Sequence, residues 1–367
     1  MTEKFIVRPY KKGDEEPIIE LLKNSFPAWA NRNKAFDYWK WKYLDAPMKS
    51  IIMVGEDNGK IIGVGHDITY KTKIGSSIYV SQYGDDYATH QEYRGLGVYT
   101  DITKAINKIQ EDEMRINYSY SLSTNPIIIN KSRQDIDDKI KFQFTKPLTH
   151  LIRVKDIQRH IDNKFINKKK MALFGYTVLK GMNRIVNTFT SKKYDLSDYT
   201  IEDLKYFDSD FDIFWDEIKD NYNFINEKRS EYLNYRYCDP RGGRYVIKKL
   251  IEKGVFIGLI VLELKKSMDY YEGYIVDLLT LSNKTDAVDA LVKGGCDFFD
   301  ALGVNSIHYQ TLKGQTNNEV FLKNEFINAS TPDVFITYTL IDMPEAVSSL
   351  LKTSPPDKIY FTYGSYF

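Results

Sequence analysis

The chain has few cysteines and no strong excess of either charge. Of its 367 residues only Cys238 and Cys296 are cysteines, and they lie far apart without the spacing of metal ligands. A disulfide framework and a zinc site are therefore not expected. With 51 Lys plus Arg against 50 Asp plus Glu, the chain lacks the basic excess that is typical of proteins that bind nucleic acid. We expect no metal cofactor and no nucleic-acid partner.

Long apolar runs are also absent. Hydrophobic residues make up 43% of the chain, but no run is long enough to span a bilayer, and no basic and apolar leader follows Met1. We therefore expect a protein without an integral membrane segment that is located in the cytoplasm. At roughly 100 to 200 residues per domain, the length predicts two domains.

The first 122 residues alternate between strand and helix patterns. Apolar periodicity predicts elements over residues 4–10 (strand), 14–26 (helix), 36–44 (helix), 51–54 and 61–64 (strands), 77–89 (strand), 99–112 (helix) and 118–122 (strand). Asn58 and Gly59 between the two short strands form the strongest hairpin signal. The pattern predicts a sheet with helices packed against it.

A nine-residue aromatic segment recurs in the second half of the chain. Residues 37–45 are echoed 194 positions later by residues 231–239, with two tyrosines and the final aspartate identical. The turn and strand at residues 58–63 are matched by residues 253–258 at an offset of 195. Two matches in the same order at nearly one offset predict that a whole domain is duplicated.

A basic and apolar stretch, residues 163–190, lies between the two copies. We interpret it as an amphipathic linker helix with solvated lysines. A membrane-surface helix is the alternative, which the lack of Trp and of segregated faces disfavours. The predicted boundaries are residues 1–155 for the N-terminal domain, 156–194 for the linker and 195–367 for the C-terminal domain.

The most informative turn follows the strand over residues 77–89. Gly95 and Gly97 leave backbone N–H groups uncovered where the next helix begins. Free amides and the positive end of the helix dipole therefore meet at one place, which suits a diphosphate. A Gly-x-Gly sequence alone is a weak signal of a diphosphate site. The residues that precede it strengthen this signal.

Thr89, Tyr93, Arg94, Gly95 and Gly97, between a strand and a helix, resemble the acetyl-CoA signature of the GCN5-related N-acetyltransferase (GNAT) family, Gln/Arg-x-x-Gly-x-Gly/Ala. The resemblance covers residues 3 to about 152. It implies an α/β (α+β) protein of two tandem GNAT folds, each a mixed, mostly antiparallel sheet flanked by helices. It also implies acetyl-CoA as the co-substrate.

The same resemblance implies which residues bind the cofactor. Amides of the turn and of the helix start would hold the CoA diphosphate, and the end of the preceding strand would pair with the pantetheine arm like an added strand. The residues so implied are Tyr87, Ala88, Thr89, Arg94, Gly95, Leu96, Gly97, Val98, Tyr99, Thr100 and Asn125. Tyr99 departs from the pattern, which has Gly or Ala there. For Asn125, a plain turn residue ahead of Pro126 is the alternative.

Acyl transfer to an amine needs a base, stabilisation of the oxyanion and a proton donor for the thiolate. The candidate catalytic residues are Asp86, Asp85 and Tyr120. Strand alternation should send one aspartate to the cleft and the other to the opposite face, and we favour Asp86 as the base. Tyr120 has a phenol that can donate a proton. Ser132 stands where the family usually has its acid tyrosine, which leaves the general acid unassigned.

The second copy retains a strand over residues 273–281, but Ser282 to Asp286 replace the glycine turn. We expect this copy to keep the fold without binding CoA and to help select the acceptor. The sequence thus predicts an N-acetyltransferase that transfers acetyl from acetyl-CoA to the amine of a small molecule. Resemblance to bacterial tandem proteins associated with surface polysaccharide synthesis suggests an amino sugar. The alternatives are a Fem-type aminoacyl transferase and a non-catalytic acyl-CoA sensor.

Overall fold

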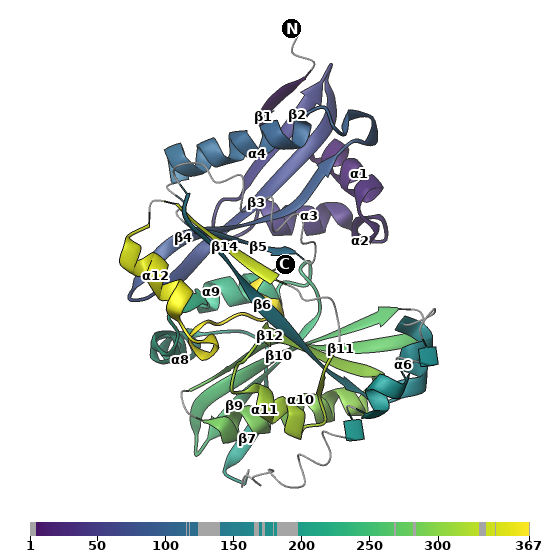
Figure 1. Cartoon of the computed structure of the whole chain (residues 1–367), viewed down its shortest axis with the longest axis vertical. Helices are drawn as coiled ribbons and strands as arrows, with labels where there is room; N and C mark the ends of the chain where they lie inside the picture. The colour runs from purple at the N-terminus through teal and green to yellow at the C-terminus, as the bar shows by residue number, and fades with distance from the viewer. Residues whose placement is uncertain are drawn as a thin grey trace. The chain divides into compact units, whose positions relative to one another are not determined.

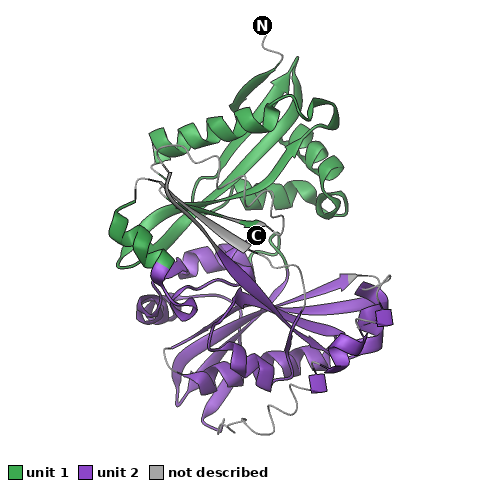
Figure 2. Ribbon diagram, in the orientation of Figure 1, with its two compact units in different colours: residues 1–145, 239–243, 336–352 green, residues 146–238, 244–335, 353–367 purple. Residues whose placement is uncertain are grey.

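The structure is a computed structural model, and it describes residues 5–114, 116, 118–123, 140–164, 169–170, 173–178, 180–181, 197–267, 269–281, 284–329, 335–341 and 343–366. The chain forms two compact units, coloured green and purple in Figure 2. Unit 1 comprises residues 1–145, 239–243 and 336–352, and unit 2 comprises residues 146–238, 244–335 and 353–367. The domain boundaries at residues 155 and 194 stay a prediction.

Unit 1 contains strands in the order β1-β2-β3-β4-β5 (Figure 1). Neighbouring strands are antiparallel except β4 and β5, which are parallel. These strands are β1 (Ile6–Pro9), β2 (Ile51–Asp57), β3 (Lys60–Ile74), β4 (Ser77–Thr89) and β5 (Tyr118–Ser123). The other elements are α1 (Glu15–Ser25), α2 (Pro27–Ala30), α3 (Ala35–Tyr43), η1 (Gln91–Tyr93), α4 (Val98–Ile109), η2 (Gln110–Met114) and, for most of their length, β14 (Phe335–Ile341) and α12 (Glu345–Thr353).

Unit 2 contains strands in the order β7-β9-β10-β11-β12, again with one parallel pair, β11 and β12. These strands are β7 (Tyr199–Leu204), β9 (Tyr245–Glu252), β10 (Val255–Ser267), β11 (Tyr270–Thr280) and β12 (Ser306–Leu312). The other elements are the end of β6 (Ile140–Val154), α6 (Ile157–Lys164), α8 (Ser209–Ile218), η3 (Lys219–Asn221), β8 (Phe224–Asn226), α9 (Ser230–Leu233), η4 (Asn234–Cys238), α10 (Thr285–Ala301), α11 (Asn318–Lys323), β13 (Ile327–Asn328), η5 (Pro356–Lys358) and η6 (Tyr363–Ser365).

The predicted fold class is confirmed, because each unit is a mixed, mostly antiparallel sheet with helices packed on it. The two units also share a detail of the hairpin before their third strands. Asn58 and Gly59 have φ of 49° and 81°, and Lys253 and Gly254 have φ of 50° and 85°. Two successive residues with positive φ are typical of the type I′ turn, which matches the twist of a hairpin.

Glycines in β2 and β3 allow α4 to lie close to the sheet. The apolar residues Val98, Ile102 and Ile106 recur at four-residue spacing and are buried, so this face of α4 packs inward. A Cβ at Gly63 would lie 2.5 Å from the Val98 side chain. The start of α4 therefore packs directly against the backbone of β3 at Gly63, where no side chain intervenes.

In the part of the chain that the structure describes, no helix has the length and apolar character needed to cross a membrane. The described residues also contain no group of three or more His, Cys, Asp or Glu placed to hold a metal ion. Of the predicted linker helix, residues 169–170, 173–178 and 180–181 are helical, and most of the rest lies outside the described residues.

Gly63→Ala should destabilise unit 1 by about 1–3 kcal/mol, because the new methyl group overpacks the contact between β3 and α4. Gly175→Ala is the matched control, since a Cβ there meets nothing within 4 Å in a helical segment. It should be neutral or stabilising by roughly 0.5–1 kcal/mol. Urea unfolding followed by tryptophan fluorescence measures both. Equal stability of the two variants would contradict the close packing of α4.

Candidate functional site

β4 carries a β-bulge opposite β3. Val64 pairs with Ala88 and His66 pairs with Asp85, so β4 has one more residue than β3 between these two pairs. Asp86 lies in the bulge with φ of 48°, a left-handed conformation that is uncommon for a residue other than glycine. Bulges change the direction in which nearby side chains point.

The bulge overturns the expected alternation of Asp85 and Asp86. The Lys42 ammonium lies 2.6 Å from Asp85 Oδ2 and 3.0 Å from Asp86 Oδ2, so both carboxylates bind one cation. The Tyr43 hydroxyl also donates to Asp86 Oδ2, at 2.5 Å. Only 4% of the Lys42 side chain is exposed. Asp85 and Asp86 therefore lie on the same side of β4, against α3.

The two carboxylates differ in acidity. Although burial opposes ionisation, the Lys42 ammonium and the hydrogen bond from Tyr43 lower the pKa of Asp86. Burial raises the pKa of Asp85, which Lys42 offsets only in part. Asp85 is thus the more basic of the two when ionised, whereas the sequence favoured Asp86 as the base.

His66 supports the bulge from β3. It is fully buried, and Trp39 Nε1 donates to its Nε2 at 3.0 Å. Because an indole N–H only donates, Nε2 must accept, and the imidazole proton is on Nδ1. His66 Nδ1 lies 3.2 Å from the Asp86 carbonyl oxygen and donates to it. Burial lowers the pKa of His66 to about 4, so this neutral form persists at neutral pH.

β4 extends beyond its parallel neighbour β5. The two strands pair from Ser81 with Tyr118 to Tyr83 with Tyr120. In this register Asp86 would lie opposite Ser123, the last residue of β5, so residues 87–89 continue past the end of β5. Their other edge pairs with β3. No strand of the described residues pairs with this side of residues 87–89, which leaves an edge to which an extended ligand could add as a strand.

The glycine turn has the geometry of an anion site. Gly95 and Gly97 have φ of 79° and 91°, and Gly97 directly precedes α4. The first bond of that helix runs from Asp101 N to Gly97 O at 2.9 Å. The amides of Val98, Tyr99 and Thr100 precede this bond and have no acceptor within the helix. A Cβ at Gly95 would meet nothing within 4 Å, so the turn is open above its amides.

Other predicted cofactor residues have partners within the protein. The Leu96 amide donates to the Tyr93 carbonyl at 3.3 Å, and Arg94 Nε donates to the Thr89 carbonyl at 3.4 Å. The Tyr99 side chain is 58% exposed, so it points away from the core. Asn125 and Ser132 lie outside the described residues.

The tyrosines near the site are engaged in packing. The Tyr87 hydroxyl donates to Asp67 Oδ1 at 2.5 Å. Burial and the Asp67 carboxylate raise the pKa of Tyr87 well above its usual value, so its phenol is a poor acid. Tyr120 is buried, with its ring centroid 5.4 Å from that of Tyr83 and 5.9 Å from that of Tyr70.

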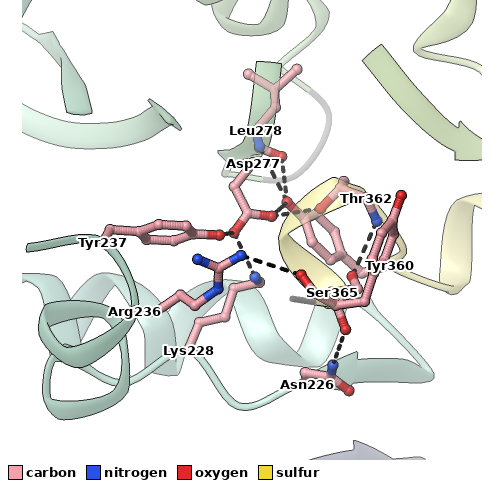
Figure 3. Close-up of polar contacts among 10 residues, drawn as sticks. Asn226, Lys228, Arg236, Tyr237, Asp277, Leu278, Tyr360, Thr362 and Ser365 are labelled. Atoms are coloured by element: carbon pink, nitrogen blue, oxygen red, sulfur yellow. Dashed lines mark hydrogen bonds and ion pairs between the residues drawn. The ribbon is translucent and has the colours of Figure 1, made fainter. Parts of the chain in front are cut away.

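Unit 2 also has a β-bulge, next to Asp277 and not at it, and it repeats the tyrosine contact. Val261 pairs with Asp277 and Leu262 pairs with Ile275, which leaves Val276 as the extra residue of β11. Tyr237, at the repeat position of Tyr43, donates its hydroxyl to Asp277 Oδ2 (Figure 3). The cation is Lys228, whose Nζ lies 2.7 Å from Asp277 Oδ2 with both side chains 1% exposed.

The end of β11 is bonded to the C-terminal segment of the chain. Gly258 pairs with Thr280 as Gly63 pairs with Thr89, so Leu278 corresponds to Tyr87. The Leu278 amide donates to the Tyr360 hydroxyl at 3.2 Å, and that hydroxyl lies 3.1 Å from the Leu278 carbonyl oxygen (Figure 3). Tyr360 thus bonds to the backbone groups whose counterparts at Tyr87 have no such side-chain partner among the described residues.

The turn after this strand is also shorter. Eight residues, 90–97, separate β4 from α4, whereas four residues, 281–284, separate β11 from α10. Ser282 and Asn283 lie outside the described residues. Unit 2 thus has neither the length of the glycine turn nor its two glycines.

Sequence reasoning assigned no role to Lys42, Tyr43 or His66. The repeat of residues 37–45 marks the segment that contains Lys42 and Tyr43, but not the strand that they contact. His66 had no signal, since a lone buried histidine in a strand looks like any core position.

Comparisons with known proteins agree with this geometry. Residues 6–127 match the model of the acetyltransferase (GNAT) domain. No curated protein matches the chain.

Three solved structures have the same fold at low identity. A conserved protein of unknown function from Enterococcus faecalis V583, described as a probable N-acyltransferase, is 11% identical with a TM-score of 0.59, over 92% of this chain and 72% of that one. Saccharomyces cerevisiae N-myristoyltransferase with bound myristoyl-CoA is 11% identical with a TM-score of 0.58, over 93% and 83%. A GCN5-related N-acetyltransferase from Anabaena variabilis ATCC 29413 is 12% identical with a TM-score of 0.59, over 90% and 72%.

These structural similarities concern the fold, whereas the family match covers the bulge and the glycine turn themselves. The part of the chain that is similar to the GNAT acetyltransferase domain is therefore residues 6–127, which contain the bulge and the glycine turn.

Proposed function

We propose that this protein transfers an acetyl group from acetyl-CoA to the amine of a small acceptor. Two observations in the described part of unit 1 carry this proposal. No described strand pairs with one side of residues 87–89, and the first amides of α4 have no acceptor within the helix. The edge suits the amide groups of pantetheine, and the helix start suits a diphosphate. A longer acyl group is the alternative, and thiol-release assays with acyl-CoA of different chain lengths separate the two.

The reaction forms a bond between the acceptor nitrogen and the acetyl carbon and breaks the C–S bond of the thioester. CoA leaves as the thiolate and is protonated by the proton that the attacking nitrogen loses. The amine must first lose its ammonium proton. A base works best when its pKa is near the working pH, and burial moves the pKa of Asp85 in that direction. We therefore assign the base to Asp85. The contacts among Lys42, Tyr43 and Asp86 stabilise the bulge next to Asp85.

The acceptor that we propose to test first is an amino sugar, which follows from the resemblance of the glycine turn. We also propose that the chain is a tandem duplication, supported by the shared strand order and by the matching contacts of Tyr43 with Asp86 and of Tyr237 with Asp277. Because Tyr360 occupies the corresponding edge of β11, one cofactor should bind per chain.

A non-catalytic acyl-CoA sensor is the second candidate. It is favoured by the contact of both aspartates with Lys42, which occupies the carboxylates that could act as a base. Release of free thiol from acetyl-CoA in the presence of an amine library distinguishes the two. CoA binding without turnover would support the sensor.

Acetyl-CoA should stabilise the protein against heat and titrate with a stoichiometry near one. A ligand at 100 times its Kd adds about 2.7 kcal/mol to the free energy of unfolding. Gly97→Glu should abolish both the thermal shift and the heat of binding, since a carboxylate would then lie at the diphosphate position. Gly254→Glu is the matched control, with a similar φ in a hairpin turn of unit 2. A stoichiometry of two, or binding by the Gly97 variant, would overturn the assignment.

Asp85→Asn should lower turnover by about 10²–10⁴-fold while leaving CoA affinity unchanged, because a base acts on the proton of the acceptor. Asp86→Asn should lower turnover less, through a looser bulge. Steady-state kinetics with acetyl-CoA and the best amine of the library measure both. Full activity of both variants would remove the pair from the mechanism.

Lys42→Met should destabilise unit 1 by about 3–5 kcal/mol at neutral pH, since it leaves two buried carboxylates without a cation. Without Lys42 the folded-state pKa values of Asp85 and Asp86 should rise above their unfolded values. The variant should then be closest to the wild type below a pH of about 4 and lose stability as the pH rises through the folded values.

Lys40→Met serves as the control for this substitution, because the Lys40 side chain is 48% exposed and lies 3.8 Å from Asp45. Loss of such a surface pair should cost roughly 0–1 kcal/mol. Urea unfolding at several pH values measures both variants. A pH-independent difference between Lys42→Met and the wild type would contradict the role of the ion pair.

A further inference from the structure

Three of the five histidines meet in one polar network within unit 2. His308 Nδ1 lies 3.0 Å from His150 Nε2. On its other side, His308 Nε2 lies 3.3 Å from Glu272 Oε1 and 2.8 Å from Ser306 Oγ. His160 continues the network through Tyr270, whose hydroxyl lies 3.2 Å from Ser306 Oγ.

The carboxylate at one end sets the position of each proton. The contacts with His308 and Lys164 outweigh burial and lower the pKa of Glu272 to about 2, so it is ionised and only accepts. His308 Nε2 must then carry a proton and donate. Its Nδ1 is left to accept from His150 Nε2–H. His150 therefore has its Nδ1 lone pair as an acceptor.

His150 lines a cavity of about 630 Å³, which is within the usual size of small-ligand sites. The lining residues are Leu148, Thr149, His150, Gln310, Lys313, Gly314, Gln315, Thr316, Asn318, Glu319, Asn328 and Ala329. All belong to unit 2. Apart from Gly314, Leu148 and Ala329 are the only lining residues whose side chains contain no polar atom.

Several polar atoms of this lining have no partner among the described residues. Gln310 is 6% exposed, and its Oε1 accepts from the Tyr366 hydroxyl while its Nε2 is left to the cavity. Asn328 Oδ1 accepts from Thr149, which leaves its Nδ2 as a donor. The cavity thus offers two amide donors, Gln310 Nε2 and Asn328 Nδ2, beside one acceptor, His150 Nδ1.

We propose that this cavity binds a neutral, polyhydroxylated small molecule such as a sugar ring. Each hydroxyl of such a ligand both donates and accepts, and it can satisfy the amides and the imidazole together without bringing a charge. Lys313 and Glu319, both exposed on the rim, carry opposite charges that balance. The site belongs to unit 2 alone and does not depend on the acyl transfer proposed for unit 1.

Saturation-transfer NMR of the full chain with N-acetylglucosamine, glucose and myo-inositol tests this site. At least one of the three should bind with a Kd on the order of 1 mM. Gln310→Leu should weaken binding at least tenfold, since it removes the buried amide. Gln158→Leu is the matched control, because Gln158 is exposed outside the cavity, and it should bind as the wild type does. Absence of binding of all three probes at 10 mM, or binding unchanged in Gln310→Leu, would overturn the proposal.

A second experiment tests the proton arrangement without relying on a change at the cavity. Glu272→Gln replaces the fixed acceptor by a group that can donate to His308 Nε2, which should move the His308 proton to Nδ1. His150 would then have to accept through Nε2 and carry its proton on Nδ1. Long-range ¹H–¹⁵N spectra should show both imidazoles exchanging tautomers, together with at least a tenfold loss of probe affinity. Unchanged tautomers, or exchanged tautomers with unchanged affinity, would contradict the role of His150 as an acceptor.

Discussion

One buried ammonium between two carboxylates determines the geometry of unit 1. Removing Lys42 and both aspartates from water is costly, and close hydrogen-bonded contact offsets that cost only in one arrangement. That arrangement requires Asp85 and Asp86 to point the same way, which a regular strand does not allow. The bulge of β4 provides this arrangement. It lies beside residues 87–89, the part of β4 that runs past β5 and that no described strand pairs with on that side.

Unit 2 shows that a buried lysine–aspartate ion pair can be present without an open strand edge. Asp277 keeps the bulge, the tyrosine and a buried lysine, although the lysine comes from position 228 and not from the helix position that corresponds to Lys42. The Tyr360 hydroxyl then bonds to the free backbone groups of β11. The buried charge is therefore a feature of the fold. Whether a cleft remains open depends on which segment reaches the strand edge.

Local signals predicted much of this structure, and contacts between distant segments did not. Apolar periodicity located β4 over residues 77–89, and the two glycines marked the turn, because both depend on neighbouring residues. The bulge depends on how β4 is aligned with β3, and one extra residue reverses which side chains share a face. Lys42 meets Asp85 across 43 positions, and Leu278 meets Tyr360 across 82. Nothing in either local sequence encodes its partner.

The placement of Tyr360 and Thr362 against Asp277 also bears on how the chain is made. Domains tend to fold in order as they leave the ribosome. The buried carboxylate of Asp277 receives two of its hydrogen bonds from residues that lie 83 and 85 positions later in the chain. Unit 2 therefore cannot complete its polar core until that later segment has been synthesised.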